Sequence, residues 1–432
     1  LEYIVDWGDG SVEHLASAGP VTHVFADGLF ANRISVSVLT AGGLVGDVAQ
    51  LDVQVLNVAP VMGDVTVSLA PMPDLNNDKV INIFDLGIVA ASFGQDPSLS
   101  PFVAAADLNG DGAVDFGDIS ILFGFYGQSV PQTDRVSEIP AGGTAIVEGA
   151  FTDAGVADAH DVRIDWGDGV TTLASVTQGE GEGSFFGRHT YQVAGVYKVT
   201  VSVVDDDADS DAIETVAYVT GVAVHDGVLH IVGTGAADTV SITRSPSDPT
   251  GQRIDVAASF LAGPQTFDTS GLAGAMVFTR GGDDVVTVAD DVALPFLVFG
   301  GAGDDQVDLG GGDGVVLGGA GNDVLRGGSG SDLLVGGAGN DGIAGDGGSD
   351  SAFFSGAATD YDQSTAGGVS TVTALPGSQD GTDTVVDVDD ILFEDSVDST
   401  APSANPWADD VITRLKGGND VTEKDAVWLL FD

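Results

Sequence analysis

The sequence has no cysteine and few basic residues. Its 432 residues contain 13 lysines and arginines against 66 aspartates and glutamates, so the formal net charge is −53. The absence of cysteine excludes disulfides and thiolate metal sites. The acidic excess makes nucleic acid and anionic membranes poor partners. No apolar run is long enough to span a bilayer, so we expect no membrane insertion.

The charge of the chain conflicts with its apolar content. Like charges oppose compaction, yet 43% of the residues are hydrophobic, which is too many for a disordered acidic tail. Bound cations would remove this conflict. Hard divalent ions such as Ca²⁺ prefer carboxylate and carbonyl oxygens, and a metal that binds only the folded chain stabilises the fold.

A nine-residue unit repeats six times without an insertion between Gly300 and Phe353. Its pattern is Gly-Gly-x-Gly-x-Asp-x-apolar-x. The fourth place is glycine in every unit, and the sixth is aspartate in five units. Stacked units would bury the aliphatic side chain at the eighth place and leave the aspartates between the turns. The eighth place carries Val307, Val316, Leu325, Leu334, Ile343 and Ala352.

This array resembles the RTX calcium-binding nonapeptide family, and the resemblance implies a parallel β-roll with Ca²⁺ in its glycine-rich turns. If two units form one coil, as in that family, Asp305, Asp323 and Asp341 make one column, and Asp332 and Asp350 make another. A flexible glycine-rich linker is the alternative, but linkers do not keep a period. The candidate ligands in the roll are Gly301, Gly303, Asp305, Gly319, Gly321, Asp323, Gly328, Gly330, Asp332, Gly337, Gly339, Asp341 and Asp350.

One place in the second column departs from the pattern. Gly314 stands where the first aspartate belongs, and the neighbouring Asp313 is the carboxylate that could replace it. We therefore expect two or more calcium ions in the roll, with the weakest site at this place.

Two segments share the tetrapeptide Trp-Gly-Asp-Gly after an apolar strand, and a run of alternating apolar residues follows each of them. Alternation predicts strands with one buried face, and Asp-Gly predicts a tight turn. Together these features resemble the PKD family, which implies immunoglobulin-like β-sandwiches over residues 1–60 and 131–220. Such domains act as spacers or in weak adhesion. The first copy has fewer residues before its motif, so we expect it to be truncated.

Each of these motifs combines a tryptophan with a later histidine, Trp7 with His23 and Trp166 with His189. Such side chains could stack on sugars or take part in catalysis. A recurring aromatic residue beside a β-turn is more often part of the core, and we favour packing.

A second repeat, with a period of 33 residues, lies between the two sandwich segments. Places 1, 3, 5, 7, 9 and 12 of each copy match the ligand places of an EF-hand-type calcium loop. A helical stripe of apolar residues follows each loop. We expect one calcium ion in each. The first loop consists of Asp74, Asn76, Asp78, Val80, Asn82 and Asp85, and the second of Asp107, Asn109, Asp111, Ala113, Asp115 and Asp118.

These two loop-helix units, over residues 73–128, resemble the dockerin family. The resemblance implies a small α-helical module that binds calcium and docks onto a cohesin-type protein domain. In that family docking typically tethers polysaccharide-degrading enzymes to a scaffold or cell surface. A calcium-stabilised spacer without a partner is the alternative.

Three further segments surround the array. Residues 221–299 predict irregular β-coils that lead into the roll, because short apolar pieces alternate with Gly/Asp turns. Residues 354–398 resemble the closing segment of RTX rolls and predict a cap, since the last coil would otherwise expose strand edges. Residues 399–432 predict a linker and a short helix that begins near Thr422.

No metalloprotease motif, nucleophile elbow, phosphate loop or dinucleotide fingerprint is present, so we expect no catalysis in this region. The predicted fold class is mostly β and multidomain, with PKD-like β-sandwiches, a small α-helical dockerin-like calcium module and a C-terminal parallel β-roll. The predicted function is that of a calcium-binding region of a large extracellular protein, secreted or attached to the cell surface, with calcium-dependent folding and cohesin-type docking.

Two alternatives stay open. The chain could be the accessory or anchoring tail of an extracellular polysaccharide-degrading enzyme whose catalytic domain precedes Leu1. It could also be a calcium-dependent adhesin that binds a glycan or a cell surface.

Overall fold

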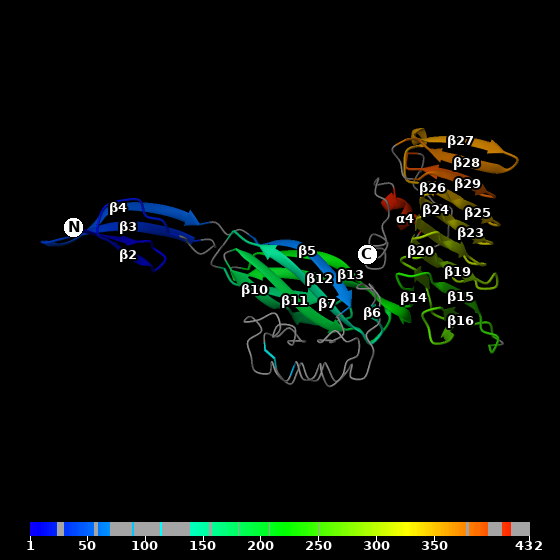
Figure 1. Cartoon of the computed structure of the whole chain (residues 1–432), viewed down its shortest axis with the longest axis horizontal. Helices are drawn as coiled ribbons and strands as arrows, with labels where there is room; N and C mark the ends of the chain where they lie inside the picture. Colours follow the sequence, from blue (N-terminus) through cyan, green and yellow to red (C-terminus); the bar gives the residue numbers. More distant parts are fainter. Residues whose placement is uncertain are drawn as a thin grey trace.

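The computed structural model describes residues 1–23, 30–55, 59–69, 89, 113–114, 139–154, 158–179, 181–206, 208–248, 250–376, 380–395 and 408–415. Strands dominate these ranges and form four sheets (Figure 1). The mostly β, multidomain fold class is therefore confirmed. The helical module predicted over residues 73–128 lies outside the described residues, apart from Val89, Ala113 and Val114.

The N-terminal unit is one antiparallel sheet with the strand order β2-β1-β3-β4. Its buried side chains include Val5 and Trp7. Figure 1 shows this unit in blue at one end of the molecule. Its strands are β1 (Glu2–Asp6), β2 (Val12–Leu15), β3 (Phe30–Thr40) and β4 (Gly43–Val55).

The second unit is a sandwich of two antiparallel sheets that enclose one apolar core, which includes Phe151, Trp166 and Tyr191. One sheet contains β8 (His160–Asp165), β9 (Thr171–Leu173), β12 (Gly195–Asp205) and β13 (Ser210–His225), with β6 (Ile139–Pro140) beside β13. The other has the order β10-β11-β7-β5 and contains β5 (Val61–Leu69), β7 (Thr144–Thr152), β10 (Ser175–Gly179) and β11 (Glu182–Thr190).

Strand β5 corrects the predicted boundary of this sandwich. Residues 131–220 were expected to form it alone, but β5 comes from before the dockerin-like segment and pairs antiparallel with β7 from Val61 to Leu69. An edge strand satisfies its backbone groups by pairing with the nearest open sheet edge, which a sequence pattern does not identify. In the sequence, the dockerin-like segment therefore separates two strands that pair in one sheet.

The Trp-Gly-Asp-Gly motif forms the same turn in both units. In the second unit Asp168 accepts a hydrogen bond from the Val170 amide at 3.1 Å, and it lies 2.6 Å from His189 Nε2. Trp166 is fully buried and stacks on His189. These side chains brace the turn and pack the core, so Trp166 does not offer a face to a sugar. The matching residues of the first unit are Trp7, Asp9, Ser11 and His23.

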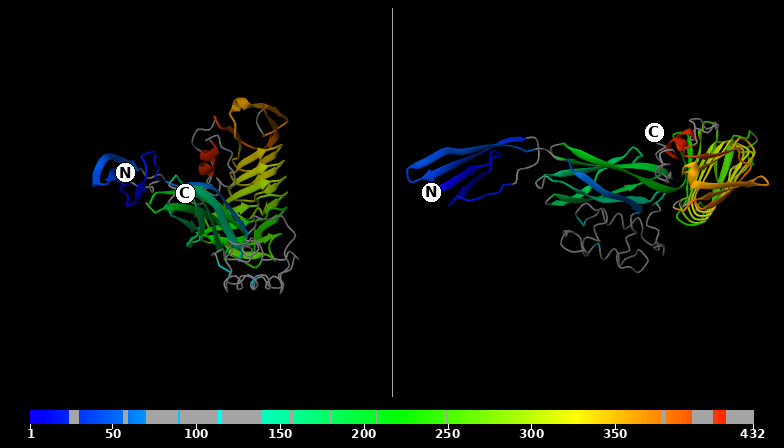
Figure 2. Two further views of the ribbon diagram at one scale, coloured as in Figure 1. Left: turned by 60° about the vertical axis from the view of Figure 1, so that its left-hand side comes forward. Right: turned by 90° about the horizontal axis from the view of Figure 1, so that it is seen from above.

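Strand β13 joins the sandwich to the roll. Its first part, Ser210 to Val219, pairs with β12, and its last part, Gly221 to His225, pairs with β14 (Val228–Val232). One 12-stranded sheet therefore continues from the sandwich into the roll. Figure 2 shows the parallel strands of the roll stacked next to the sandwich.

The roll consists of two parallel sheets whose strands alternate along the chain. Within the array, paired residues are eighteen apart, such as Val307 with Leu325 and Val316 with Leu334. The residues at the eighth place of each unit fill the space between the sheets, at 0–1% exposure. The predicted two-unit coil and its aliphatic core are confirmed. One sheet contains β18 (Gly274–Phe278), β20 (Phe296–Ala302), β22 (Gly314–Ala320), β24 (Leu333–Ala338) and β26 (Ser351–Phe354); the other contains β15 (Thr239–Arg244), β19 (Val285–Val288), β21 (Gln306–Asp308), β23 (Val324–Gly328) and β25 (Gly342–Asp346).

The first of these sheets is buried on both faces. Its strands carry continuous apolar runs, as sheets covered on both sides do, and the outward side chains form a second core with α4 (Ala408–Leu415). This core includes Leu297, Leu333 and Val411. Helix α4 was not predicted from the sequence; the helix predicted near Thr422 lies outside the described residues. Strands of the other sheet alternate instead, and they expose Gln306 and Arg326.

The segments before and after the array are also coils of the roll. In the lead-in, β14 pairs parallel with β18 and β15 with β19, and a hairpin of β16 (Arg253–Ala258) and β17 (Gln265–Asp268) extends the second sheet. In the closing segment, β29 (Thr382–Val386) pairs parallel with β25, and β30 (Asp390–Phe393) with β26. Between β26 and β29 the chain forms η2 (Ala358–Asp360) and the hairpin of β27 (Tyr361–Ala366) and β28 (Val369–Ala374). Strand β28 pairs with β29 and so covers its edge.

The turn at Trp166 provides a matched test of packing. Gly167 and Gly169 both have left-handed φ, at +78° and +87°, but a Cβ on Gly167 would lie under 3.0 Å from the Lys198 carbonyl oxygen, whereas Gly169 faces open space. Gly169→Ala should cost about 1–2 kcal/mol of stability, and Gly167→Ala about 3 kcal/mol or more. Urea unfolding, monitored by hydrogen exchange of the amides in β8 and β12, measures the stability loss of each variant. Equal losses would contradict the close approach.

Candidate metal centre

The array aspartates stand in two columns. The backbone amide of Asp305 donates to Asp323 Oδ1, and that of Asp323 to Asp341 Oδ1, both at 2.8 Å. In the other column the Asp332 amide donates to Asp350 Oδ1 at 3.0 Å. The predicted grouping of these five aspartates into two columns is confirmed. One carboxylate oxygen of each partner is thus used to hold the previous coil.

The second carboxylate oxygens differ from the first. Oδ2 of Asp305, Asp323, Asp332 and Asp341 is buried without a hydrogen-bond partner, and these residues are only 1–2% exposed. Burial raises the pKa of Asp305 and Asp323 to about 7 and that of Asp332 to about 8. A buried anion without a partner is strongly unfavourable, so these oxygens require either protons or a cation.

The first glycine of each turn leaves space beside these oxygens. A Cβ on Gly300 would lie under 3.0 Å from both Asp305 Oδ2 and the carbonyl oxygen of Gly318 in the next coil. The same holds for Gly318, which faces Asp323 Oδ2 and the Gly336 carbonyl. A side chain would fill this space. Carboxylate and carbonyl oxygens therefore converge on one small gap in successive turns.

The other predicted glycines shape the turns. Gly330 does not adopt left-handed φ, but a Cβ there would lie under 3.0 Å from the Gly312 carbonyl oxygen, so close stacking requires glycine at that place. The predicted glycines with left-handed φ are Gly301, Gly303, Gly319, Gly321, Gly328, Gly337 and Gly339.

The first step of the second column has no carboxylate. A Cβ on Gly314 would collide with the Leu309 side chain, which is buried where other units place the first glycine of the turn. Asp313 does not replace the missing aspartate. It accepts the Ser331 amide at 2.8 Å, which is the position that Asp304 holds next to Asn322. An apolar side chain thus fills the base of this column.

The first column extends beyond the array. The Asp284 amide donates to Asp305 Oδ1 at 2.8 Å, and Asp284 Oδ2 is also buried without a hydrogen-bond partner. Asp284 was not among the ligands predicted from the sequence. The signal in the sequence was the run from Arg280 to Val286, which is an imperfect nonapeptide; its Asp284 lies 21 rather than eighteen residues before Asp305.

These oxygens fit a calcium ion. Across the described ranges, no three acidic or histidine side chains converge on one point, so an ion in the columns must take several ligands from backbone carbonyls. Calcium accepts about 6–8 oxygens from carboxylates and carbonyls in flexible geometry, whereas transition metals favour nitrogen or sulfur. Asp305, Asp323, Asp332 and Asp341 would hold such ions, whose charge would keep the carboxylates ionised.

The predicted ligands of the two EF-hand-type loops lie outside the described residues, with the exception of Ala113. These are Asp74, Asn76, Asp78, Val80, Asn82, Asp85, Asp107, Asn109, Asp111, Asp115 and Asp118. Ala113, which would contribute only its carbonyl oxygen, is exposed.

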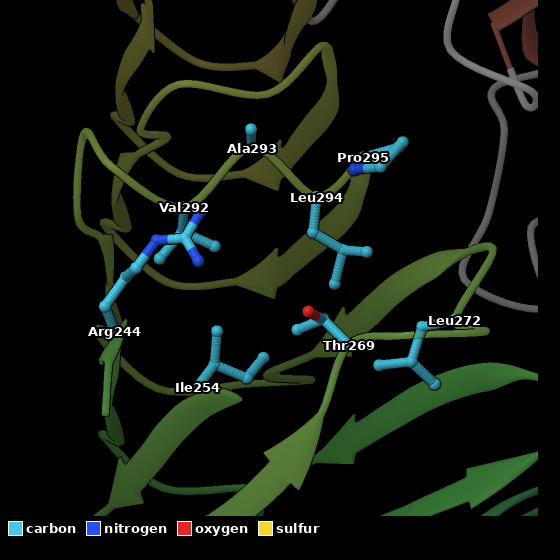
Figure 3. Close-up of a pocket in the computed structure, with 8 residues that line it drawn as sticks. All are labelled: Arg244, Ile254, Thr269, Leu272, Val292, Ala293, Leu294 and Pro295. Carbon is cyan, nitrogen blue, oxygen red and sulfur yellow. The ribbon is translucent and has the colours of Figure 1, made fainter. Parts of the chain in front are cut away.

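A cavity of about 280 Å³ lies at the base of the roll, next to the hairpin of β16 and β17 (Figure 3). Its walls include Ile254, Leu272 and Leu294. The basic residue in its wall, Arg244, already has a partner, because its Nε donates to the Asp291 carbonyl oxygen at 2.7 Å. Thr269 Oγ1 likewise donates to the backbone. The lining residues hold no acid-base pair that could do chemistry.

Comparison with protein families identifies two segments. Residues 297–316 and 317–352 match the RTX calcium-binding nonapeptide repeat, and residues 72–123 match the dockerin type I domain. The chain carries RTX repeats and a dockerin type I domain. Both families bind calcium, so Ca²⁺ is the cation indicated for the columns. No curated protein and no solved structure matches the chain.

The two families also bear on partners and location. A dockerin type I domain indicates a cohesin-type protein partner, and both families are typical of extracellular or secreted proteins. Within the described ranges, no helix is long and apolar enough to cross a membrane.

The raised pKa values predict how the calcium-free roll responds to pH. In the folded chain the pKa values of Asp305, Asp323 and Asp332 lie above the usual 3.8, so these carboxyls hold a proton more tightly than in the unfolded chain. Stability without calcium is therefore greatest below about pH 4 and falls as pH rises toward about 7–8. Thermal unfolding in chelator should show this fall, and saturating calcium should remove it because the ion binds the ionised form. A pH-independent melting temperature in chelator would contradict it.

Proposed function

We propose that this chain is a non-catalytic region of a secreted or cell-surface protein, in which calcium folds the RTX roll outside the cell and the dockerin domain docks onto a cohesin-type partner. The observation that carries the proposal is the pair of columns of buried carboxylates. Oδ2 of Asp305, Asp323, Asp332 and Asp341 has no hydrogen-bond partner, and a Cβ on the first glycine of each of these turns would lie under 3.0 Å from it. Near neutral pH such a column carries ionised carboxylates only when a cation neutralises them.

In this proposal the N-terminal sheet, which takes the place of the truncated sandwich expected over residues 1–60, and the sandwich that follows are PKD-like spacers. Their tryptophan-histidine pairs support that role, because these side chains are used within each unit to brace a turn. The continuous sheet through β13 supports it too, since a shared strand fixes the direction of the sandwich relative to the roll. The absence of a catalytic motif in the sequence is consistent with a spacer.

A second candidate is the anchoring tail of an extracellular polysaccharide-degrading enzyme. The dockerin type I match favours it, because docking modules attach other domains to a scaffold. The position of that domain between β5 and β7 supports a tethering role. The strands before and after it in the sequence, β5 and β7, pair in one sheet, so the chain is attached to the sandwich on both sides of the domain.

Calcium dependence can be tested with a matched pair of variants. Asp323→Asn removes a buried carboxylate from the column, whereas Asp304→Asn removes an exposed one whose hydrogen bond to Asn322 an amide can keep. We expect calcium to raise the melting temperature of the wild type and of Asp304→Asn, and Asp323→Asn to need about tenfold more calcium. Circular dichroism and thermal unfolding in chelator and calcium provide the readout. An unchanged spectrum and melting temperature in the wild type would sink the proposal.

Docking is tested separately at the EF-hand-type loops. The double variant Asp74→Ala and Asp107→Ala removes the first ligand of each loop, and it should weaken binding to a cohesin-type domain by about a hundredfold or more. Asp323→Asn is the control, because it alters the roll alone. Biolayer interferometry against a panel of cohesin-type domains measures both. Binding by the wild type to none of them would favour the spacer interpretation.

A further inference from the structure

The closing segment repeats the contacts of an array turn. The Asp341 amide donates to Asp383 Oδ1 at 2.7 Å, as Asp305 donates to Asp323. The Thr384 amide donates to the Asp341 carbonyl at 2.8 Å, and the Thr382 amide donates to the Asn340 side chain at 3.0 Å. The sequence separation of the aspartates is 42 residues here instead of eighteen. The first column therefore resumes after the hairpin of β27 and β28.

The backbone of the closing segment also matches that of the array. Gly381 has left-handed φ, and a Cβ there would lie under 3.0 Å from the Gly339 carbonyl oxygen. Gly339 makes the same approach to Gly321, and Gly321 to Gly303. At each step of the column, a glycine therefore lies against the carbonyl oxygen of a glycine in the preceding turn.

This last step contains two buried carboxylates. Asp341 and Asp383 are both 2% exposed, and Asp341 Oδ2 has no hydrogen-bond partner. Burial raises the pKa of both, and the charge of Asp380 raises it further. Covering apolar side chains would not by itself require the closing segment to bury Asp380 and Asp383 next to Asp341.

Protein side chains close the opposite ends of the two columns. At the base of the first column, Asp238 accepts hydrogen bonds from Thr234 Oγ1 and Ser259 Oγ at 3.0 and 2.6 Å. At the base of the second column, Leu309 occupies the space beside Gly314. At the lead-in, the Asp238 carboxylate is thus satisfied by hydroxyl groups, and an apolar side chain ends the other column. At the closing end of the first column, Asp341 Oδ2 has no such donor.

We propose that Asp341 and Asp383 form a further calcium site, outside the repeat array, by which the ion docks the closing segment onto the last coil of the roll. The proposal rests on calcium binding by the array. It adds that the ion joins two segments separated by the β27–β28 hairpin. The closing segment and its cover over β29 would then order only when calcium is bound.

The test compares two variants of the full chain. Asp383→Asn changes the column, and Asp362→Asn makes the same charge change at an exposed place on β27 of the closing segment. Native mass spectrometry counts bound Ca²⁺, and hydrogen exchange follows β23, β25, β28 and β29 as calcium is added to chelated protein. We expect Asp383→Asn to bind about one ion fewer, and its β28 and β29 to need about tenfold more calcium for protection, while β23 responds as in the wild type.

The outcomes separate this proposal from the one it rests on. Asp362→Asn should match the wild type in ion count and exchange. An unchanged ion count in Asp383→Asn, or protection of β28 and β29 in chelator, would overturn the further site while leaving the array intact. Absence of bound calcium in the wild type would overturn calcium binding by the array itself. If Asp383→Asn failed to fold, Asp383→Glu, which keeps the charge but shifts its oxygens, should still lose the ion; retention of the full count would count against the site.

Discussion

The burial of aspartate columns between stacked turns is the constraint that governs the C-terminal half. Each carboxylate uses one oxygen to hold the backbone of the previous coil and leaves the other in a gap lined by carbonyl oxygens. The coil-to-coil hydrogen bonds and the electrostatic cost therefore come from the same side chains. Without a cation, compaction forces these groups toward protonation, since burial raises their pKa. In the function that we propose, calcium turns these buried carboxylates from an electrostatic cost into a link between coils.

The two sheets of the roll are covered differently. The sheet of β20, β22 and β24 is covered on both faces, by the interior core and by the core with α4. The opposite sheet faces solvent with alternating polar residues. Apolar burial thus stabilises one sheet throughout, whereas the turns between the sheets depend on the aspartates. Strand β13 continues the covered sheet into the sandwich, so the roll and the sandwich share backbone hydrogen bonds rather than only a flexible connection.

Insertions are tolerated where they leave a ladder of hydrogen bonds intact. The dockerin-like segment separates β5 from β7, yet these strands pair along their length. The hairpin of β27 and β28 separates β26 from β29, yet the column resumes at Asp383. In both cases the long insertion adds little loop-closure cost compared with the contacts that resume after it. The dockerin-like segment and the β27–β28 hairpin are thus inserted in the chain without breaking the contacts of the segments on either side.

The roll was predictable from the sequence alone. A strict period of nine, with glycine at the fourth place and an apolar residue at the eighth, predicted the core of Val307 to Ala352. The resemblance to RTX repeats, which implies two units per coil, added the coil and the two columns. The pattern also distinguishes the two sheets. Every second unit carries a continuous apolar run, and these units form the sheet that is buried on both faces. Local patterns carry this information, since each unit contacts mainly its neighbours.

The pairings between distant segments emerged only in three dimensions. The fold places β5 in the second sandwich, α4 against Val315 and Leu333, and Asp383 next to Asp341. It also fills the gap at Gly314 with Leu309, where the sequence suggested Asp313. A repeat predicts the next unit at its own spacing. It does not predict which segment returns after an irregular insertion, because that depends on edges and gaps that exist only once the coils have stacked.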